Sequence, residues 1–379
     1  MIYLDNGATS FPKPAGMLRA MHECMRDYCG NPGRSGHRMS IKTGEEIYKA
    51  RKELGKLFQI DDFSRIVFTC NTTEALNLGI KGILERGDHV ITSAMEHNSV
   101  LRPLKALEKE GIETTIIRCA SDGTLNIENL KKEIRGNTKL IVCTHASNVT
   151  GTIMPIKEIG ETAKQKNIFF MVDAAQSAGS LPIDVKKMKI DLLALPGHKG
   201  LLGPMGTGML YVGEDVPLRP LREGGTGTRS RELDQPMEFP DGYEAGTVNA
   251  PGIVGLGYSA GYISKLGVNN IRAYEEELIS VLDSALRNME GVTVYGSWNS
   301  KKKTGISLFN LKNLSCEEVC DRLNSNYGIA ARGGYHCAAL AHKTIGTYDI
   351  GAVRLSVGPF NTKKEINVAI EAIYQMQKA

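Results

Sequence analysis

The sequence predicts an α/β protein with a mostly parallel seven-stranded sheet flanked by helices, followed by a smaller α+β C-terminal domain. Two observations predict this fold. Short apolar runs alternate with longer amphipathic stretches as far as residue 212, and the apolar runs are nearly continuous. Strands of that kind lie buried on both faces of a parallel sheet, with helices as the crossover connections.

The seven expected strands are residues 65–70, 89–93, 113–118, 139–144, 168–172, 191–195 and 208–212. Amphipathic patterns between them predict helices at residues 73–86, 100–110, 127–134 and 156–166. A Gly-, Arg- and Pro-rich region, residues 217–246, breaks this alternation and predicts loops around a site.

Residues 252–289 then predict one or two long helices. Strand patterns at 305–310 and 353–357 and helical patterns at 316–324 and 363–376 predict the smaller domain. We expect the large domain to span residues 15–250, and residues 1–14 to join residues 251–379 in the small domain.

Composition excludes several classes of protein. The 379 residues are 41% hydrophobic and 23% charged, as in an average globular protein, and a net charge of +4 gives no reason to expect nucleic-acid binding. The run Lys301–Lys303 predicts a solvated turn. No apolar segment reaches membrane-spanning length, and the N-terminus lacks a signal-peptide pattern. The eight cysteines contain no Cys-x-x-Cys pair, so we expect no disulfide framework and a cytoplasmic location.

Polar residues follow five of the expected strands. Since ligands collect at the carboxyl ends of parallel strands, these residues are expected at one edge of the sheet. The sequence places there Asn71-Thr72-Thr73-Glu74, His97, Asn148, Asp173 with Gln176, and His198-Lys199.

Each of these signals has an ordinary alternative. Thr72 and Thr73 form either a phosphate cradle at a helix start or a simple helix cap. Asp173 either caps the next helix or pairs with a protonated pyridine nitrogen. A lysine between two glycines, as Lys199 is, is either solvated or a nucleophile that forms a Schiff base. Their coincidence at one edge favours the functional interpretation.

The ordered set of motifs resembles the cysteine desulfurase and selenocysteine lyase branch of the class V, fold-type I enzymes that use pyridoxal phosphate (PLP). The resemblance covers essentially the whole chain and is carried by residues 3–9, 71–74, 96–98, 147–151, 172–176, 197–199, 244–249, 332–337 and 354–356.

The resemblance implies a role for each residue. Lys199, Cys337 and His97 would be the catalytic residues, with Lys199 bound covalently to PLP and His97 stacked on its ring. Asp173 would pair with the ring nitrogen and Gln176 with the phenolic oxygen. The phosphate would be held by Thr72, Thr73 and His198, and by Thr247 of a neighbouring subunit in a homodimer. Asn148, Arg332 and Arg354 would bind the substrate, with Arg354 on its carboxylate, and Asn148 would also contact the cofactor. No metal site is expected.

Cys337 decides between the members of this group. In the enzymes that the chain resembles, a cysteine in this setting attacks the substrate sulfur and keeps it as a persulfide. Arg332, His336 and the preceding glycines predict a flexible, electropositive place that favours a thiolate. Arg354 follows Cys337 by 17 positions, a short connection that resembles the SUF-type branch. The alternative is an inert buried cysteine.

Two residues depart from the family pattern. Pro196 stands where a serine usually donates to the phosphate, and it offers no N–H or side-chain donor. Tyr335 stands where the SUF-type pattern usually carries another histidine.

The resemblance implies a PLP-dependent cysteine desulfurase acting on L-cysteine, with a protein or small-thiol sulfur acceptor and no nucleic-acid or membrane partner. A selenocysteine lyase acting on L-selenocysteine is the first alternative. A class V aminotransferase would need Lys199 and Asp173 but not Cys337. A scaffold protein of this fold would not need Lys199, Asp173 and Arg354 together.

Overall fold

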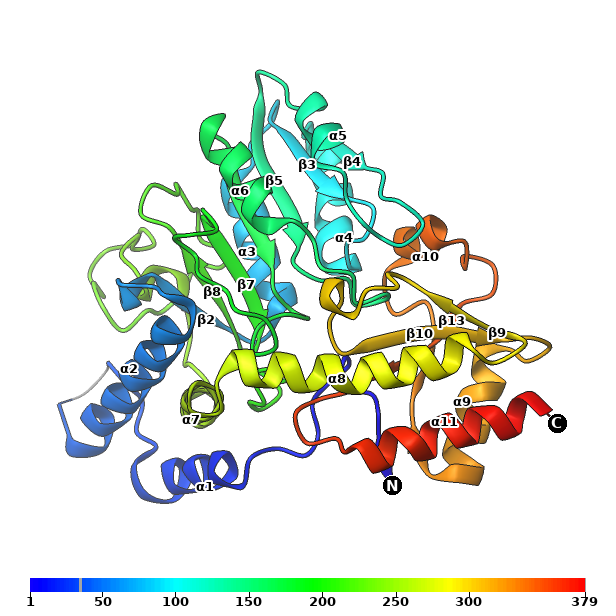
Figure 1. The fold of residues 1–379 in the computed structure, drawn as a ribbon. Helices are drawn as coiled ribbons and strands as arrows, with labels where there is room; N and C mark the ends of the chain where they lie inside the picture. Colours follow the sequence, from blue (N-terminus) through cyan, green and yellow to red (C-terminus); the bar gives the residue numbers. More distant parts are fainter. Residues whose placement is uncertain (34–35, 379) are drawn as a thin grey trace.

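The computed structural model describes residues 1–33 and 36–378. The predicted seven-stranded sheet is confirmed, with the order β2-β8-β7-β6-β5-β3-β4 (Figure 1). Its strands are β2 (Ile66–Thr69), β3 (His89–Ser93), β4 (Glu113–Ile117), β5 (Thr138–Thr144), β6 (Phe169–Asp173), β7 (Leu192–Pro196) and β8 (Gly208–Val212). Strand β8 runs antiparallel to both of its neighbours, and the other pairings are parallel.

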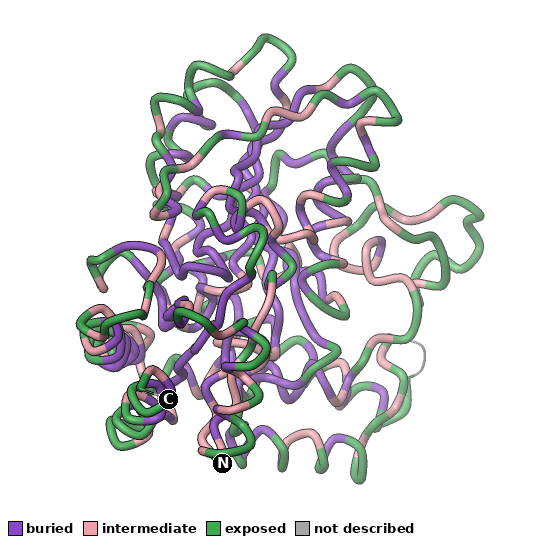
Figure 2. Tube along the Cα trace, turned by 90° about the vertical axis from the view of Figure 1, so that its right-hand side faces the viewer, coloured by how far each residue is buried: buried purple, intermediate pink, exposed green. Residues whose placement is uncertain are grey.

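Helices cover both faces of this sheet, as its near-continuous apolar strands require. Helices α3 (Thr72–Ile83) and α4 (Asn98–Leu107) pack on one face, against a cluster that includes Val90, Val142 and Met171. Helices α2 (Arg38–Phe58), α6 (Ile156–Gln165) and α7 (Ala250–Leu266) pack on the other, against Ile91 and Cys143. Successive strand residues therefore serve opposite cores. Figure 2 shows the buried residues concentrated between these layers.

The segment 252–289 forms two helices rather than one. Helix α7 ends at Leu266, and α8 (Val268–Arg287) begins after Gly267, whose φ of 81° lies in the left-handed region that glycine adopts without strain. Helix α7 packs on α1 (Ala15–Glu23) and α2, while α8 runs on beneath the second sheet (Figure 1).

The second sheet is antiparallel, with the order β12-β13-β10-β9. It comprises β9 (Val292–Tyr295), β10 (Ile306–Leu311), β12 (Arg332–Gly334) and β13 (Ala352–Ser356). Helices α8, α9 (Cys316–Tyr327) and α11 (Lys363–Lys378) enclose a separate core with it. The chain start joins this unit because β1 (Ile2–Tyr3) pairs in parallel with β11 (Ile329–Ala330). These contacts agree with the expected α+β region, while the domain boundaries stay a prediction.

Two further features bear on the sequence interpretation. All eight cysteines are free. Within residues 1–33 and 36–378, none of the helices has the length and apolar character needed to cross a bilayer.

The solvated turn expected at Lys301–Lys303 is wrong for its last residue. The side chain of Lys303 has 0% exposure, and its Nζ lies 2.7 Å from Asp283 Oδ2 on α8. The backbone of Lys303 also forms an isolated antiparallel β-bridge with Thr152, in the segment that follows β5. A buried ammonium is tolerated here because a carboxylate pairs with it, a contact that adjacency in sequence does not reveal.

We expect Lys303→Met to lower the free energy of unfolding by about 3 kcal/mol, because it leaves the Asp283 carboxylate buried without its partner. Thermal melts followed by circular dichroism measure this loss. Lys363→Met is the matched control: Lys363 and its partner Glu277 are 62% and 50% exposed, so its loss costs under about 1 kcal/mol. Equal melting temperatures for the two variants would contradict the prediction.

Candidate active site

Five parallel strands, β2, β7, β6, β5 and β3, end at one edge of the large sheet, and a pocket lies there. The edge brings together eight of the nine residues that the sequence analysis assigned to the cofactor. The pocket is lined by Thr72, Thr73, His97, Asn148, Asp173, Gln176, His198 and Lys199, with Asn71, Leu76, Ser99, Thr144, Ala146 and Ala175.

The N-terminus of α3 forms one end of this pocket. Asn71 caps the helix by accepting a hydrogen bond from Glu74 N, so the two threonines occupy the first helical positions. The Thr72 hydroxyl and His198 Nδ1 are buried, and neither has a partner within the part of the chain that the structure describes. Unpaired buried donors at the positive end of a helix form an anion site, and a phosphate group would satisfy them.

A carboxylate and an amine share the centre of the pocket. Asp173 ends β6 with 3% exposure, and one of its oxygens accepts a hydrogen bond from Ala175 N at 2.9 Å. Burial raises the pKa of Asp173, and the Lys199 charge opposes that shift. Burial lowers the pKa of the Lys199 amine to about 8, although Asp173 raises it. A neutral amine is therefore accessible near neutral pH, as a nucleophilic lysine requires.

His97 caps α4 and faces the same pocket. Its Nδ1 accepts a hydrogen bond from Ser99 N at 3.0 Å, so the proton of the neutral ring lies on Nε2. Burial lowers the pKa of His97 to about 4, and the charge of Lys199 adds to this shift. His97 is thus a neutral, flat side chain at neutral pH.

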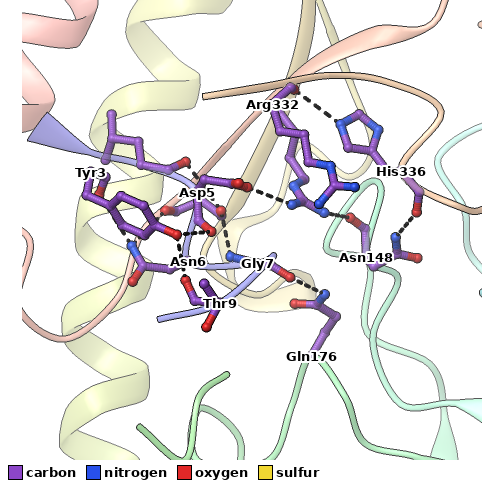
Figure 3. Close-up of polar contacts among 12 residues, drawn as sticks. Tyr3, Asp5, Asn6, Gly7, Thr9, Asn148, Gln176, Arg332 and His336 are labelled. Atoms are coloured by element: carbon purple, nitrogen blue, oxygen red, sulfur yellow. Dashed lines mark hydrogen bonds and ion pairs between the residues drawn. The ribbon is translucent and has the colours of Figure 1, made fainter. Parts of the chain in front are cut away.

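Gln176 and Asn148 have protein partners that the sequence did not suggest. The Gln176 amide donates to Gly7 O at 2.9 Å, which ties the N-terminal segment to the pocket (Figure 3). The Asn148 amide donates to His336 O at 2.6 Å (Figure 3). Asn148 therefore connects the pocket wall to the segment that carries Cys337.

Arg332 and Arg354 are register partners on the antiparallel strands β12 and β13. Two cations directly opposite each other repel, so an anion between them is favoured. Arg354 has a side-chain exposure of 3% and donates to Asp5 Oδ1 at 2.9 Å and to Asn148 O at 2.9 Å. Its Nε is buried with no partner in the described ranges. Together, these features form a second anion site, which the small domain contributes.

Asp5 is a residue of this site that the residue-by-residue interpretation missed. It lies 349 positions before Arg354, and no local pattern marks it as the partner of an arginine. Its only signal was its place in the N-terminal motif, residues 3–9.

Cys337 lies on a tight turn, with an exposed thiol. His336 and Cys337 have φ angles of 51° and 57°, a left-handed conformation that costs non-glycine residues roughly 1–3 kcal/mol each. Hydrogen bonds hold both carbonyl groups of the turn. His336 O accepts from Asn148, and Cys337 O accepts from Asn98 N, the first amide of α4, at 2.8 Å. The turn is therefore held by two segments of the large sheet's edge, the start of α4 at Asn98 and the loop that contains Asn148.

The expected contribution of His336 to the electropositive setting of Cys337 is wrong, because His336 is 5% exposed and neutral. The expected flexibility of the turn stays a prediction, and in the structure hydrogen bonds hold both of its carbonyl groups. Burial, together with a smaller contribution from the charge of Arg354, lowers the pKa of His336 to about 3. Positive charge near the cysteine comes from the arginines alone. Tyr335, the departure from the SUF-type pattern, is exposed, and its ring packs edge-on against His342 and Tyr348.

Thr247 and Pro196 complete the sequence-predicted set. Thr247 is exposed and does not line the pocket, so its expected role depends on a second subunit. Pro196 is the last residue of β7 and pairs with Gly208 of β8, where the antiparallel register places it at the strand end.

Comparisons with known proteins show which family the chain belongs to. A model of the family "Aminotransferase class-V" matches residues 2–368. The chain is 33% identical to a probable cysteine desulfurase of Methanothermobacter thermautotrophicus, covering 99% of this chain and 94% of the relative. It is also 33% identical to a cysteine desulfurase of Escherichia coli, covering 100% and 94%. The apo structure of a cysteine desulfurase from Thermococcus onnurineus NA1 has a TM-score of 0.94 and 35% identity, covering 100% and 94%.

We expect Asn148→Ala to loosen the Cys337 turn, because it removes the buried donor to His336 O. The hydrogen bond stabilises the closed turn by about 1 kcal/mol, so its loss should speed hydrogen exchange of the amides in residues 335–338 roughly fivefold. Hydrogen exchange followed by mass spectrometry measures this rate. Asn137→Ala is the control, since Asn137 donates to Gly87 O at 2.9 Å at an exposed site away from the turn. Unchanged exchange in the Asn148 variant would show that the bond does not hold the turn.

Proposed function

Because the chain belongs to the aminotransferase class-V family and its curated relatives are cysteine desulfurases, we propose that it converts L-cysteine to L-alanine and keeps the sulfur as a persulfide on Cys337. The observation that carries the proposal is the position of Cys337. Its exposed side chain lies on a turn whose carbonyl groups accept hydrogen bonds from Asn148 and Asn98. Asn148 also lines the pocket of Lys199 and Asp173, and its carbonyl oxygen accepts from Arg354.

Pyridoxal phosphate fits the residues of the pocket. The unpaired Thr72 hydroxyl and His198 Nδ1 at the start of α3 suit its phosphate, the buried Asp173 carboxylate suits its ring nitrogen, and Lys199 suits its aldehyde. When bound, the group supplies an electron sink for the carbanion formed at the substrate Cα. Pro196 removes one phosphate donor that relatives have, and the helix N-terminus and Thr73 remain.

The pocket residues would divide the work as follows. Asp173 keeps its negative charge when a cationic ring nitrogen pairs with it, which compensates the cost of its burial. Lys199 would hold the cofactor covalently and, once released from it, would move the Cα proton as a neutral amine. His97 would offer its flat, neutral ring to the cofactor ring, and Gln176 would contact the phenolic oxygen.

The arginine pair would bind the substrate carboxylate. Arg354 keeps its Nε donor unpaired among the described residues, and Asp5 and Asn148 O fix its guanidinium plane. A planar two-pronged donor is suited to a carboxylate. Arg332, more exposed and on the neighbouring strand, adds the second positive charge.

The sulfur transfer balances without an external oxidant. The thiolate of Cys337 attacks the substrate sulfur, an S–S bond forms, and the substrate Cβ–S bond breaks. The electron pair of the broken bond stays on the substrate carbon, which takes a proton and leaves as alanine. Cys337 thus becomes a persulfide, and a thiol of an acceptor protein or a small molecule removes the terminal sulfur.

Selenocysteine lyase activity is the second candidate. It would use the same pocket and carboxylate site but depend less on Cys337, because selenolate is a better leaving group. An aminotransferase would leave the pinned turn and its exposed thiol without a role.

The proposal includes a homodimer, in which Thr247 of the partner subunit reaches the phosphate. The exposure of Thr247 and its absence from the pocket of its own chain support this arrangement. Eight free thiols suit a reducing cytoplasm as the place of action.

We expect apo-protein mixed with pyridoxal phosphate to form a covalent linkage at Lys199 that borohydride fixes and peptide mass spectrometry locates. The rate should rise about tenfold from pH 7 to 9 and then level off, because the amine loses its proton as the pH rises through about 8. An exposed lysine would gain rate up to about pH 10.5. Lys199→Ala should show no linkage, and reduced cofactor on another lysine would refute the assignment.

We expect Cys337→Ala to bind the cofactor with an unchanged absorption spectrum but to release alanine from cysteine on the order of 10² times more slowly, since the sulfur acceptor is missing. Release of alanine from selenocysteine should fall less. Cys29→Ala, which removes another exposed cysteine, is the control. If the Cys337 variant released alanine from cysteine as fast as the wild type, the persulfide mechanism would be excluded. Formation of an oxo acid in place of alanine would instead indicate transamination or simple β-elimination.

A further inference from the structure

A chain of buried polar groups runs from helix α10 (Ala339–Ile345) to the Cys337 turn. The Thr347 hydroxyl lies 2.7 Å from His342 Nδ1, and His342 Nε2 lies 3.3 Å from His336 Nδ1. His336 Nε2 lies 3.2 Å from Arg332 O, as Figure 3 shows. His342 and Thr347 have 0% exposure. None of these contacts involves a residue that lines the pocket, and Arg332 takes part only through its main-chain carbonyl.

The last acceptor in this chain fixes the direction of every hydrogen bond. A backbone carbonyl only accepts, so Arg332 O requires the proton of the His336 ring on Nε2. His336 Nδ1 is then an acceptor, which requires a donor N–H on His342 Nε2. His342 Nδ1 is in turn an acceptor, and the Thr347 hydroxyl donates to it. Burial lowers the pKa of His342 to about 4, in keeping with two neutral rings.

We propose that His342 is a positioning residue for the nucleophile: its Nε2–H holds the His336 ring, and through it the left-handed turn that presents Cys337. The inference rests on the proposed function, in which Cys337 accepts the sulfur. Thr347 has the supporting role of selecting the tautomer of His342 that donates.

The turn needs such an anchor because its conformation is unfavourable for both residues. Asn148 and Asn98 hold the two carbonyl groups. Among the described residues, the hydrogen bonds of the His336 side chain are those with His342 and Arg332. Without the donor, His336 Nδ1 would be buried and unpaired, and rotation of the ring toward solvent would relieve it. Both ring nitrogens are occupied, so His336 acts by holding the turn and does not take the thiol proton.

Simple packing is the competing explanation. The two imidazole rings are stacked, with centroids 5.5 Å apart and an interplanar angle of 11°. A phenylalanine at position 342 keeps a stacked ring but lacks the donor. A glutamine lacks the ring, but its Nε2 donor lies about as far from the backbone as the Nε2 atom of histidine.

The holoenzyme variants His342→Gln and His342→Phe separate the two explanations. We expect His342→Gln to keep kcat for alanine formation within about threefold of the wild type. His342→Phe should lose about tenfold in kcat, equivalent to about 1.4 kcal/mol. Its KM should not change, because the arginine pair is intact. The rate of Cys337 alkylation by iodoacetamide should not fall in His342→Phe, which shows that the thiol is present but misplaced.

Thr347→Val and Thr347→Ser form a second pair that leaves the ring in place. The main-chain bonds of Thr347 to His342 and Gly351 survive both substitutions. Only valine removes the hydroxyl donor, so kcat should fall about threefold in Thr347→Val and recover in Thr347→Ser.

The opposite order at position 342, with phenylalanine active and glutamine impaired, would overturn the proposal. If both position-342 variants are impaired, the threonine pair decides, and equal kcat for Thr347→Val and Thr347→Ser overturns it. Alkylation of Cys337 needs no desulfurase turnover. Failure of the proposed function would therefore appear as undiminished alanine release in Cys337→Ala, separately from these results.

Discussion

The common direction of five strands is the constraint on which the rest of this molecule depends. Strand β8 lies between β2 and β7 in the sheet and is antiparallel to both. Strands β2 and β7 therefore point in the same direction. The carboxyl ends of β2, β3, β5, β6 and β7 consequently meet at one edge. Each of these strands is followed by polar residues. The shared strand direction therefore brings Thr72, Asp173 and Lys199 to the same edge of the sheet.

The second sheet adds residues that the large sheet lacks. The pocket at the edge of the large sheet, which we propose to hold a phosphate and an aromatic ring, has no arginine among its lining residues. Strands β12 and β13 bring Arg332 and Arg354, and the turn after β12 brings Cys337. Hydrogen bonds from Asn148 and Asn98 then join the turn to the large sheet's edge. The position of Cys337 thus depends on contacts between the two sheets as much as on either sheet.

Much of this could be predicted from the sequence, since strand periodicity and the residues after each strand are local signals. All seven strands of the large sheet and the residues of the pocket were predictable in this way. Three features were not: the burial of Lys303, the neutrality of His336 and the pairing of Asp5 with Arg354. Each depends on a partner distant in sequence or on burial by another element, and neither periodicity nor spacing carries that information.

The pairing of β1 with β11 has a consequence for how the protein is made. The ribosome finishes the large sheet at Val212, and domains generally fold as units during synthesis. The N-terminal segment that carries Asp5 and Gly7, however, cannot take its place until residues 329–330 and Ser356 have left the ribosome. A nascent chain therefore carries a nearly complete lysine pocket long before its carboxylate site exists. A chain that stops before residue 329 therefore lacks both Arg354 and the strand against which the N-terminal segment pairs.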